Sequence, residues 1–277
     1  MLTTTPEAVP AVRAWRAPPS GVWLLACALL ALLGLFGWGR TPWARYLAQQ
    51  SVAAHWARDA LFLVDWALMS AAMMLPTALP LVNAVRRASA GLARHAQVVG
   101  ACMLAFMAVW VGAGLVLRAV QMLVLDLWPQ ISVGAPGVFA ATLLLGGSGT
   151  YLLLPLAQRC ASACRSPFGF VARLWGGTGG AVRWGGRIGL AYGLSCLGCC
   201  WPLMLLMCAL GLTDPLWMLA GVAVMLLQKH PRWAVPSTRG LGLILLLLAS
   251  AVALGWLDLA RVAPQWQSGG WGWCRSL

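Results

Sequence analysis

Acidic residues and histidines are both scarce in this sequence, with six Asp and Glu and three His among 277 residues. Charged residues make up only 9% of the chain. A soluble domain carries about 25% charged residues, so an ordinary water-exposed domain is excluded. Magnesium, calcium and manganese sites need clusters of carboxylates that so few acids cannot build. The sequence also lacks a P-loop, a Rossmann fingerprint and a Ser-His-Asp arrangement. ATPase, dehydrogenase and hydrolase functions therefore have no residues to support them.

Apolar residues take up 61% of the chain, and the mean hydropathy is +0.81. A bilayer core of about 30 Å takes about 20 apolar residues in a helix. Seven runs are candidates for spans, namely 21–38, 61–84, 97–123, 136–156, 188–211, 214–228 and 240–257. We predict an all-α, polytopic transmembrane helical bundle of six or seven spans, since the sixth run is short.

The predicted bundle covers residues 21–257, with one long cytoplasmic loop at 157–187. The preceding tail, 1–20, is rich in Thr, Pro and Ala and is expected to be disordered and cytoplasmic. Residues 258–277 form a C-terminal tail.

Basic residues are distributed unevenly between the two ends of the predicted spans. Thirteen of the 19 Lys and Arg fall in the N-terminal tail and the second, fourth and sixth loops, five fall on the other side, and Arg118 lies within the third span. The positive-inside rule then places the N-terminus in the cytoplasm and the C-terminus outside. The net charge of +13 is thus a topology signal, and no nucleic acid partner is expected. Arg118 is predicted to pair with Asp65 or Asp126, because a charge within a span needs a partner.

The run SCLGCCWPLM places Cys196, Cys199 and Cys200 within the fifth span. By helical periodicity Cys196, Cys200 and Met204 share one face, with Cys199 at its edge. Cys199 lies about 100° around the helix from Cys200, so at most two of the three thiols are expected to face one ion. Buried Cys and Met are often packing residues, and we interpret the isolated Cys27, Cys102, Met103 and Met225 in that way. Three thiols within five residues instead indicate a ligand or redox role.

Pro202 lies within the same run and cannot donate to the helix ladder. Its ring crowds the carbonyl of Gly198, so we expect the helix to loosen beside the thiols and to free that carbonyl.

A second group of sulfur atoms lies in the second span, at Met69, Met73 and Met74. Counting residues from the outer end puts Met73 and Met74 about 18 to 20 Å into the bilayer, at the depth of Cys196 to Cys200 on the opposed fifth span. This coincidence predicts a site shared by thiolates and a thioether, for which Met73, Met74 and Met204 are the candidates.

Cys160 and Cys164 are one helical turn apart in the predicted 157–187 loop. They either pass an ion at the cytoplasmic mouth of the bundle or are simply interfacial residues. The three histidines, His55, His95 and His230, occur singly in predicted loops or helix ends, where solvated or interfacial roles are expected.

Three motifs resemble those of the bacterial family of predicted metal-binding integral membrane proteins, a domain of unknown function. They are MMLP at residues 73–76, CASACRSP at residues 160–167 and GLSCLGCCWPLM, and the resemblance spans roughly residues 60 to 232. It implies a multi-pass protein of the bacterial inner membrane with a metal site. In that family a His commonly stands at the position of Tyr192, and an acidic residue stands at that of Gln228. These departures disfavour any mechanism that needs an imidazole or a buried carboxylate ligand here.

The softness of the ligands selects among metals. Thiolates and thioethers favour Cu(I), while Zn(II) or another soft ion is the alternative. We therefore predict a membrane protein that transports Cu(I) or hands it on, with a metal chaperone or a metalloenzyme under assembly as its partner and the lipid bilayer around it. Two alternatives stay open, a thiol-disulfide oxidoreductase that uses Cys196 and Cys199 and an assembly factor without transport.

Overall fold

The computed structural model describes residues 19–38, 55–127, 136–177, 180–210, 215–230 and 232–257, and within these ranges the only regular structure is helical. The all-α prediction is confirmed. The helices are α1 (Pro19–Trp38), α3 (His55–Ala88), α4 (His95–Leu127), α5 (Pro136–Leu153), α6 (Pro155–Arg165), α7 (Pro167–Leu174), α8 (Ala181–Leu210), α9 (Pro215–Lys229) and α10 (Ala234–Ala253). The predicted tails, 1–20 and 258–277, lie almost wholly outside the described residues.

Proline marks the beginning of several helices. Helices α5, α6, α7 and α9 each begin at a proline, whose missing N–H is not needed in the first turn and whose fixed φ suits a helix. Leu154, between α5 and α6, is extended. The residue before a proline is disfavoured in the helical region, so the chain breaks there and α6 can take a new direction.

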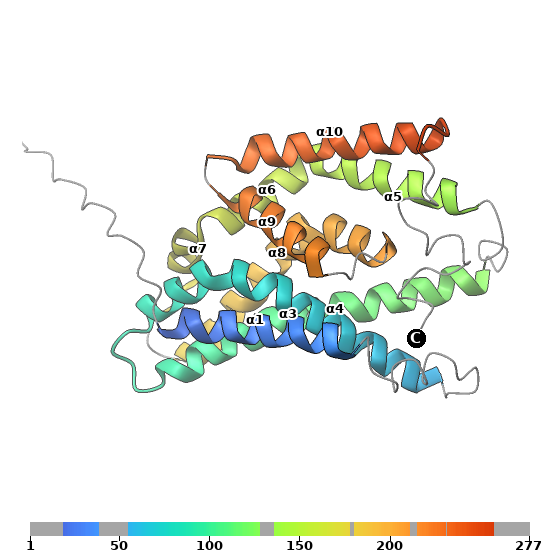
Figure 1. Ribbon diagram of the computed structural model, residues 1–277. Helices are drawn as coiled ribbons and strands as arrows, with labels where there is room; N and C mark the ends of the chain where they lie inside the picture. Colours follow the sequence, from blue (N-terminus) through green and yellow to red (C-terminus); the bar gives the residue numbers. More distant parts are fainter. Residues whose placement is uncertain are drawn as a thin grey trace, which may run out of the picture.

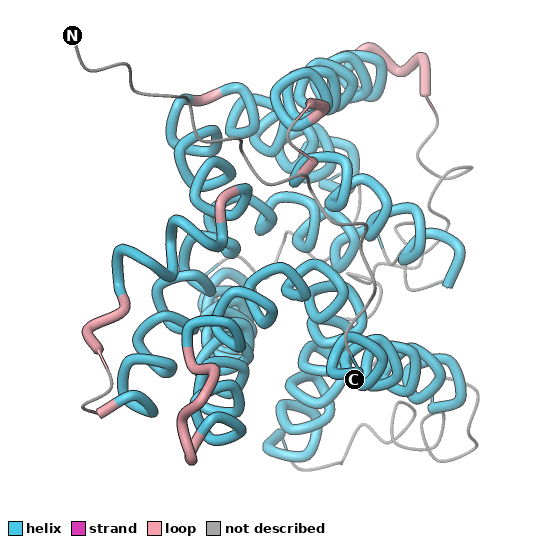
Figure 2. The backbone as a smooth tube through the Cα atoms, turned by 90° about the vertical axis from the view of Figure 1, so that its left-hand side faces the viewer, coloured by secondary structure: helices cyan, strands magenta, loops and turns pink. Residues whose placement is uncertain are grey.

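The long helices lie side by side along a common direction (Figures 1 and 2). Helices α1, α3, α4 and α8 form one group, and α5 packs along α10 as a second group. Helices α6, α7 and α9 lie against the first group. The larger core cluster contains the buried cysteines and methionines, whereas the cluster around α5 and α10 is built from Leu, Ala and Val.

Helices α4 and α8 form the most extensive contact in the bundle, and glycines allow their close approach. A Cβ atom at Gly189 would clash with the backbone carbonyl of Cys102, and one at Gly185 would stand 2.5 Å from the carbonyl oxygen of Val98. Small residues at such spacing let two helix backbones meet without intervening side chains. This contact fixes α8, and the thiols on it, against α4.

Four helical segments are long and apolar enough to cross a membrane, which indicates a membrane protein. They are Phe62–Ala88, His95–Val120, Ala181–Met207 and Ala234–Ala253. Ala141–Leu153 and Leu219–Lys229 are shorter apolar helices. Six or seven spans therefore remains a prediction. The connections between α3 and α4, between α6 and α8 and between α9 and α10, which carry many of the basic residues, lie at the same end of the bundle (left in Figure 1).

Two sequence-based expectations need correction. The predicted loop at 157–187 instead contains α6, α7 and the beginning of α8, and it contributes the buried residues Cys164 and Val171 to the core. The guanidinium Nε of Arg118 donates to Asp59 Oδ1 at 2.8 Å, and Asp65 takes no part in this ion pair. Asp59 lies about a third of a turn around α3 from Asp65, at about 100° per residue, yet it is at the level of Arg118 in the antiparallel helix α4. The side chain of Asp126 lies outside the described residues.

Candidate metal centre

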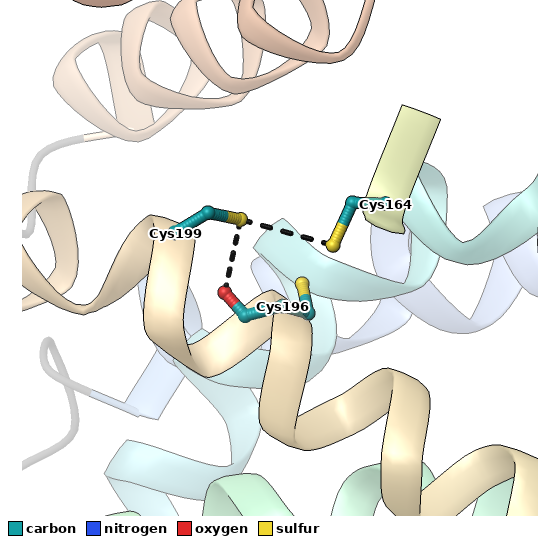
Figure 3. A group of neighbouring side chains, drawn as sticks. All are labelled: Cys164, Cys196 and Cys199. Atoms are coloured by element: carbon teal, nitrogen blue, oxygen red, sulfur yellow. Dashed lines mark hydrogen bonds between the residues drawn. The ribbon is translucent and has the colours of Figure 1, made fainter. Parts of the chain in front are cut away.

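Three cysteine thiols from two helices meet inside the bundle. The sulfur atoms of Cys164 from α6 and of Cys196 and Cys199 from α8 all lie within 4.8 Å of one another, and all three residues are buried (Figure 3). The Cys199 thiol lies 3.9 Å from the Cys164 sulfur and donates to the Cys196 carbonyl oxygen at 3.2 Å. Sulfur atoms this close can reach a single soft ion with small side-chain rotations, because Zn–S bonds are about 2.3 Å long and Cu(I) likewise takes thiolate ligands.

Cys200 adjoins this trio, with its sulfur 3.2 Å from that of Cys199. Two thiols of α8, those of Cys196 and Cys199, belong to the group within 4.8 Å, so our expectation that at most two thiols of α8 face one ion stays a prediction. Helical periodicity fixes where Cβ points, but rotation about χ1 moves the sulfur atom further around the helix. Two adjacent cysteines can thus bring their sulfurs together without unwinding of the backbone.

A thioether from α3 reaches the thiols, as the matched depths predicted. Met74 Sδ lies 4.0 Å from Cys196 Sγ, and neither residue has any exposed surface. Met73 points elsewhere, because its methyl group packs with that of Met207 against Gly221 of α9. Met204 lies two turns beyond Cys196 and borders a separate apolar cavity of about 630 Å³, together with Trp66 and Trp110.

Tyr192 holds α6 in place beside α8. Its hydroxyl donates to the backbone carbonyl oxygen of Cys164 at 3.0 Å, and its ring packs against Phe106 and Phe170. Tyr192 therefore orients the residue that carries the third thiol. From the sequence, Tyr192 was noted only because it replaces a His that is common in the family. The local sequence pattern does not show which helix its hydroxyl contacts.

Pro202 frees the carbonyl of Gly198, as predicted, but α8 continues as a helix through it. Tyr151 of α5 donates its hydroxyl to that carbonyl oxygen at 2.6 Å, and its ring packs edge-on against Trp201 at 5.0 Å between centroids. An external donor thus replaces the lost helical hydrogen bond, so the expected loosening is not needed. Cys160 is half-buried, and its sulfur lies next to Gly198, one turn from Cys164.

Helix α9 supplies residues that sequence reasoning missed. Lys229 Nζ lies 3.5 Å from Cys196 Sγ. Met225 and Gln228 border, with Lys229, a cavity of about 10 Å³ that also adjoins Cys199 and Cys200. From the sequence, Lys229 was counted among the basic residues of the sixth loop and noted as the lysine that follows Gln228 in the family pattern, and Met225 was interpreted as packing, so neither was assigned to the metal site. The sequence did hold a signal for these two residues. Met225 and Lys229 are four residues apart and share one face of α9 with Gly221, so they face the same neighbours.

Histidines and carboxylates do not join the described cluster. His95 Nδ1 lies 2.8 Å from the Ser89 hydroxyl at the junction of α3 and α4, and His230 is exposed. Asp65 is buried, and its Oδ1 has no hydrogen-bond partner among the described residues. The metal-ligating groups brought together in the described part of the chain are therefore sulfur atoms.

A family model described as a copper chaperone, PpoB2, matches residues 63–252. The chain belongs to the PpoB2 family. The matched region begins in α3 and ends in α10, and it includes every helix that contributes to the thiol cluster. No curated protein and no solved structure matches the chain. The description of the family names copper, and the buried site is made of soft sulfur ligands, which suit Cu(I) as well as Zn(II).

Proposed function

We propose that this protein binds Cu(I) inside the membrane and hands it on. The proposed ligands are the thiolates of Cys164, Cys196 and Cys199, with Cys200 and the Met74 thioether in reach. The observation that carries the proposal is the convergence of three buried thiols from α6 and α8 within 4.8 Å. The copper chaperone family supports the same ion.

The composition of the site favours a transferable ion over a permanent structural one. Cu(I) accepts two or three soft ligands, so a cluster of four thiols and a thioether offers alternative ligand sets at one place. An ion can then exchange one sulfur for another while it moves. A structural zinc site instead holds one closed tetrahedral set of ligands.

Further sulfur atoms lie next to the cluster. Cys160 is half-buried and one turn from Cys164, and its sulfur lies next to Gly198, between Cys196 and Cys199 on α8. Met73 and Met207 lie next to each other at Gly221, further along α3 and α8 from the thiols. We propose that Cys160, Met73 and Met207 receive or release the ion beside the thiols, with a metal chaperone or a metalloenzyme under assembly as the partner.

The competing function is thiol-disulfide exchange between Cys196 and Cys199. The seven described cysteines are free thiols, and Cys199 has three sulfur neighbours instead of one dedicated partner. A redox pair needs a defined partner sulfur and a route for electrons. The arrangement therefore favours metal binding.

Titration of the full-length protein, purified in detergent under reducing conditions, against a chromophoric Cu(I) chelator tests the proposal. Wild type is expected to retain Cu(I) stoichiometrically. Cys164→Ser, Cys196→Ser and Cys199→Ser should each weaken binding by at least about tenfold, since even changes beyond the direct ligands cost about 10–100-fold. Met74→Leu should weaken it less.

Cys27→Ser is the matched control, because Cys27 is an exposed residue of α1 outside the family match. Its affinity should equal that of wild type. Unchanged affinity in all three site variants would refute the thiol site. A thiol count on the same sample identifies the redox alternative, which requires Cys196 and Cys199 to form a disulfide that a physiological reductant reopens.

A further inference from the structure

A lysine ammonium group lies directly beside the thiols. Lys229 Nζ is 3.5 Å from Cys196 Sγ, and among the described residues no carboxylate pairs with it. The lysine is the last residue of α9, and its side chain turns into the bundle instead of toward the surface. A cation is unusual at a site for cations, because it repels any metal ion that binds there.

Lys229 is half-buried, and the end of its side chain lies among groups that carry no opposite charge other than the thiols. The cavity that it shares with Cys199, Cys200 and Gln228 has a volume of about 10 Å³, enough for about one water molecule. The Gln228 amide Nε2 is buried with no hydrogen-bond partner, so it contributes a second donor and no negative charge. Because the thiols themselves are buried, the interaction between the ammonium group and an ion bound to them is stronger than in water.

Soft ligands alone do not separate Cu(I) from Zn(II), because thiolates bind both ions well. A fixed positive charge does separate them, because Coulomb repulsion from Lys229 is twice as large for a divalent ion as for a monovalent one at the same position. We propose that Lys229 is a specificity-determining residue that makes the thiol site select monovalent soft ions over divalent ones. This inference rests on the proposed copper site.

Competition titrations of purified full-length variants test this selection of monovalent ions by the charge of Lys229, which we call the charge filter. Lys229→Leu and Lys229→Gln remove the charge without adding a sulfur ligand. Each should lower the ratio of Cu(I) to Zn(II) affinity by at least about tenfold, mainly through tighter Zn(II) binding. Lys229→Arg keeps the charge and should keep the ratio. Arg232→Gln removes one charge at an exposed position nearby and is the matched control, with no change in the ratio expected.

A second measurement uses wild type alone, so it does not depend on the folding of a variant. Ag(I) and Cd(II) are both soft ions but differ in charge. Ag(I) should displace Cu(I) from the protein at an excess at which Cd(II) does not. Equal displacement by the two ions would overturn the filter.

The two proposals fail in different ways. An unchanged affinity ratio in both neutral Lys229 variants, with Cu(I) still bound, refutes the filter and leaves the copper site intact. Equal weakening of both ions means that Lys229 only maintains the structure of the site, which also refutes the filter. Absence of Cu(I) binding in wild type refutes the copper site and the filter with it.

Discussion

At the residue scale, the most informative feature is how one backbone carbonyl is satisfied. Pro202 deprives the Gly198 carbonyl of its helical donor. The hydroxyl of Tyr151, on α5, donates to that carbonyl oxygen instead, at 2.6 Å. An unsatisfied polar group in an apolar interior costs about 1–3 kcal/mol. The hydroxyl therefore stabilises α8 at the turn that carries Cys199 and Cys200.

We expect Tyr151→Phe to lower the free energy of unfolding by about 1–3 kcal/mol, because it leaves the Gly198 carbonyl without its donor. Thermal unfolding in detergent measures this. Thr150→Val is the matched control, since it removes an exposed hydroxyl that bonds only within its own helix, to the Gly146 carbonyl. If Tyr151→Phe unfolds at the same temperature as the control, the hydroxyl is not needed to satisfy that carbonyl.

At the element scale, the contact between α4 and α8 decides where the thiols stand. Gly185 and Gly189 face the backbone carbonyls of Val98 and Cys102 on α4. In lipid, helices associate mainly through close packing of such small residues. The position of Cys196, two turns beyond Gly189 on α8, depends on this contact, and so does its distance from Met74 on α3.

Gly189→Ala is expected to destabilise the bundle by about 1–3 kcal/mol, because the added methyl meets backbone that cannot move aside as a side chain would. It should also reduce Cu(I) retention by displacing α8. Gly186→Ala is the control, since a Cβ there has no neighbour within 4 Å. Folded yield by size-exclusion chromatography and bound copper report both effects. Equal behaviour of the two variants would show that the contact tolerates a wider separation of the helices.

At the scale of the whole molecule, the fold gathers several connections that carry basic residues at one end of the bundle. The connections at the end of the bundle shown at the left in Figure 1 include those between α3 and α4 and between α6 and α8, where many arginines lie. Cytoplasmic loops of membrane proteins carry such an excess of basic residues. We propose that this end of the bundle faces the cytoplasm and that the ion reaches the thiols from there, beside α6 with Cys160 and Cys164.

Reporter fusions test this orientation and the number of spans. A fluorescent protein fused after Gly177 should fluoresce, and alkaline phosphatase at the same point should be inactive, because this segment is predicted to be cytoplasmic. Fusions after Leu277 should give the opposite result if there are seven spans. Phosphatase activity after Gly177 would contradict the orientation, whereas identical behaviour at both points would contradict an odd number of spans.

Several features of the fold and the site follow from the sequence alone. Long apolar runs with few charges can satisfy their backbone in a bilayer only as helices, so the all-α fold was predictable. The depth of each sulfur atom follows from a fixed rise per residue, which is why Met73 and Met74 could be placed at the level of Cys196 to Cys200 before the contact of Met74 with Cys196 was known. The freed carbonyl of Gly198 follows from the position of Pro202.

Only the tertiary structure decided which side chains from separate helices meet. Cys164 joins Cys196 and Cys199 because Leu154 redirects the chain into α6 and Tyr192 holds α6 against α8. Lys229 reaches the thiols because α9 packs along the same core. Arg118 pairs with Asp59 and not with Asp65 because neighbouring helices set the rotation of α3. Periodicity within one helix fixes a residue's height and direction, whereas the partner that it faces depends on how the helices pack.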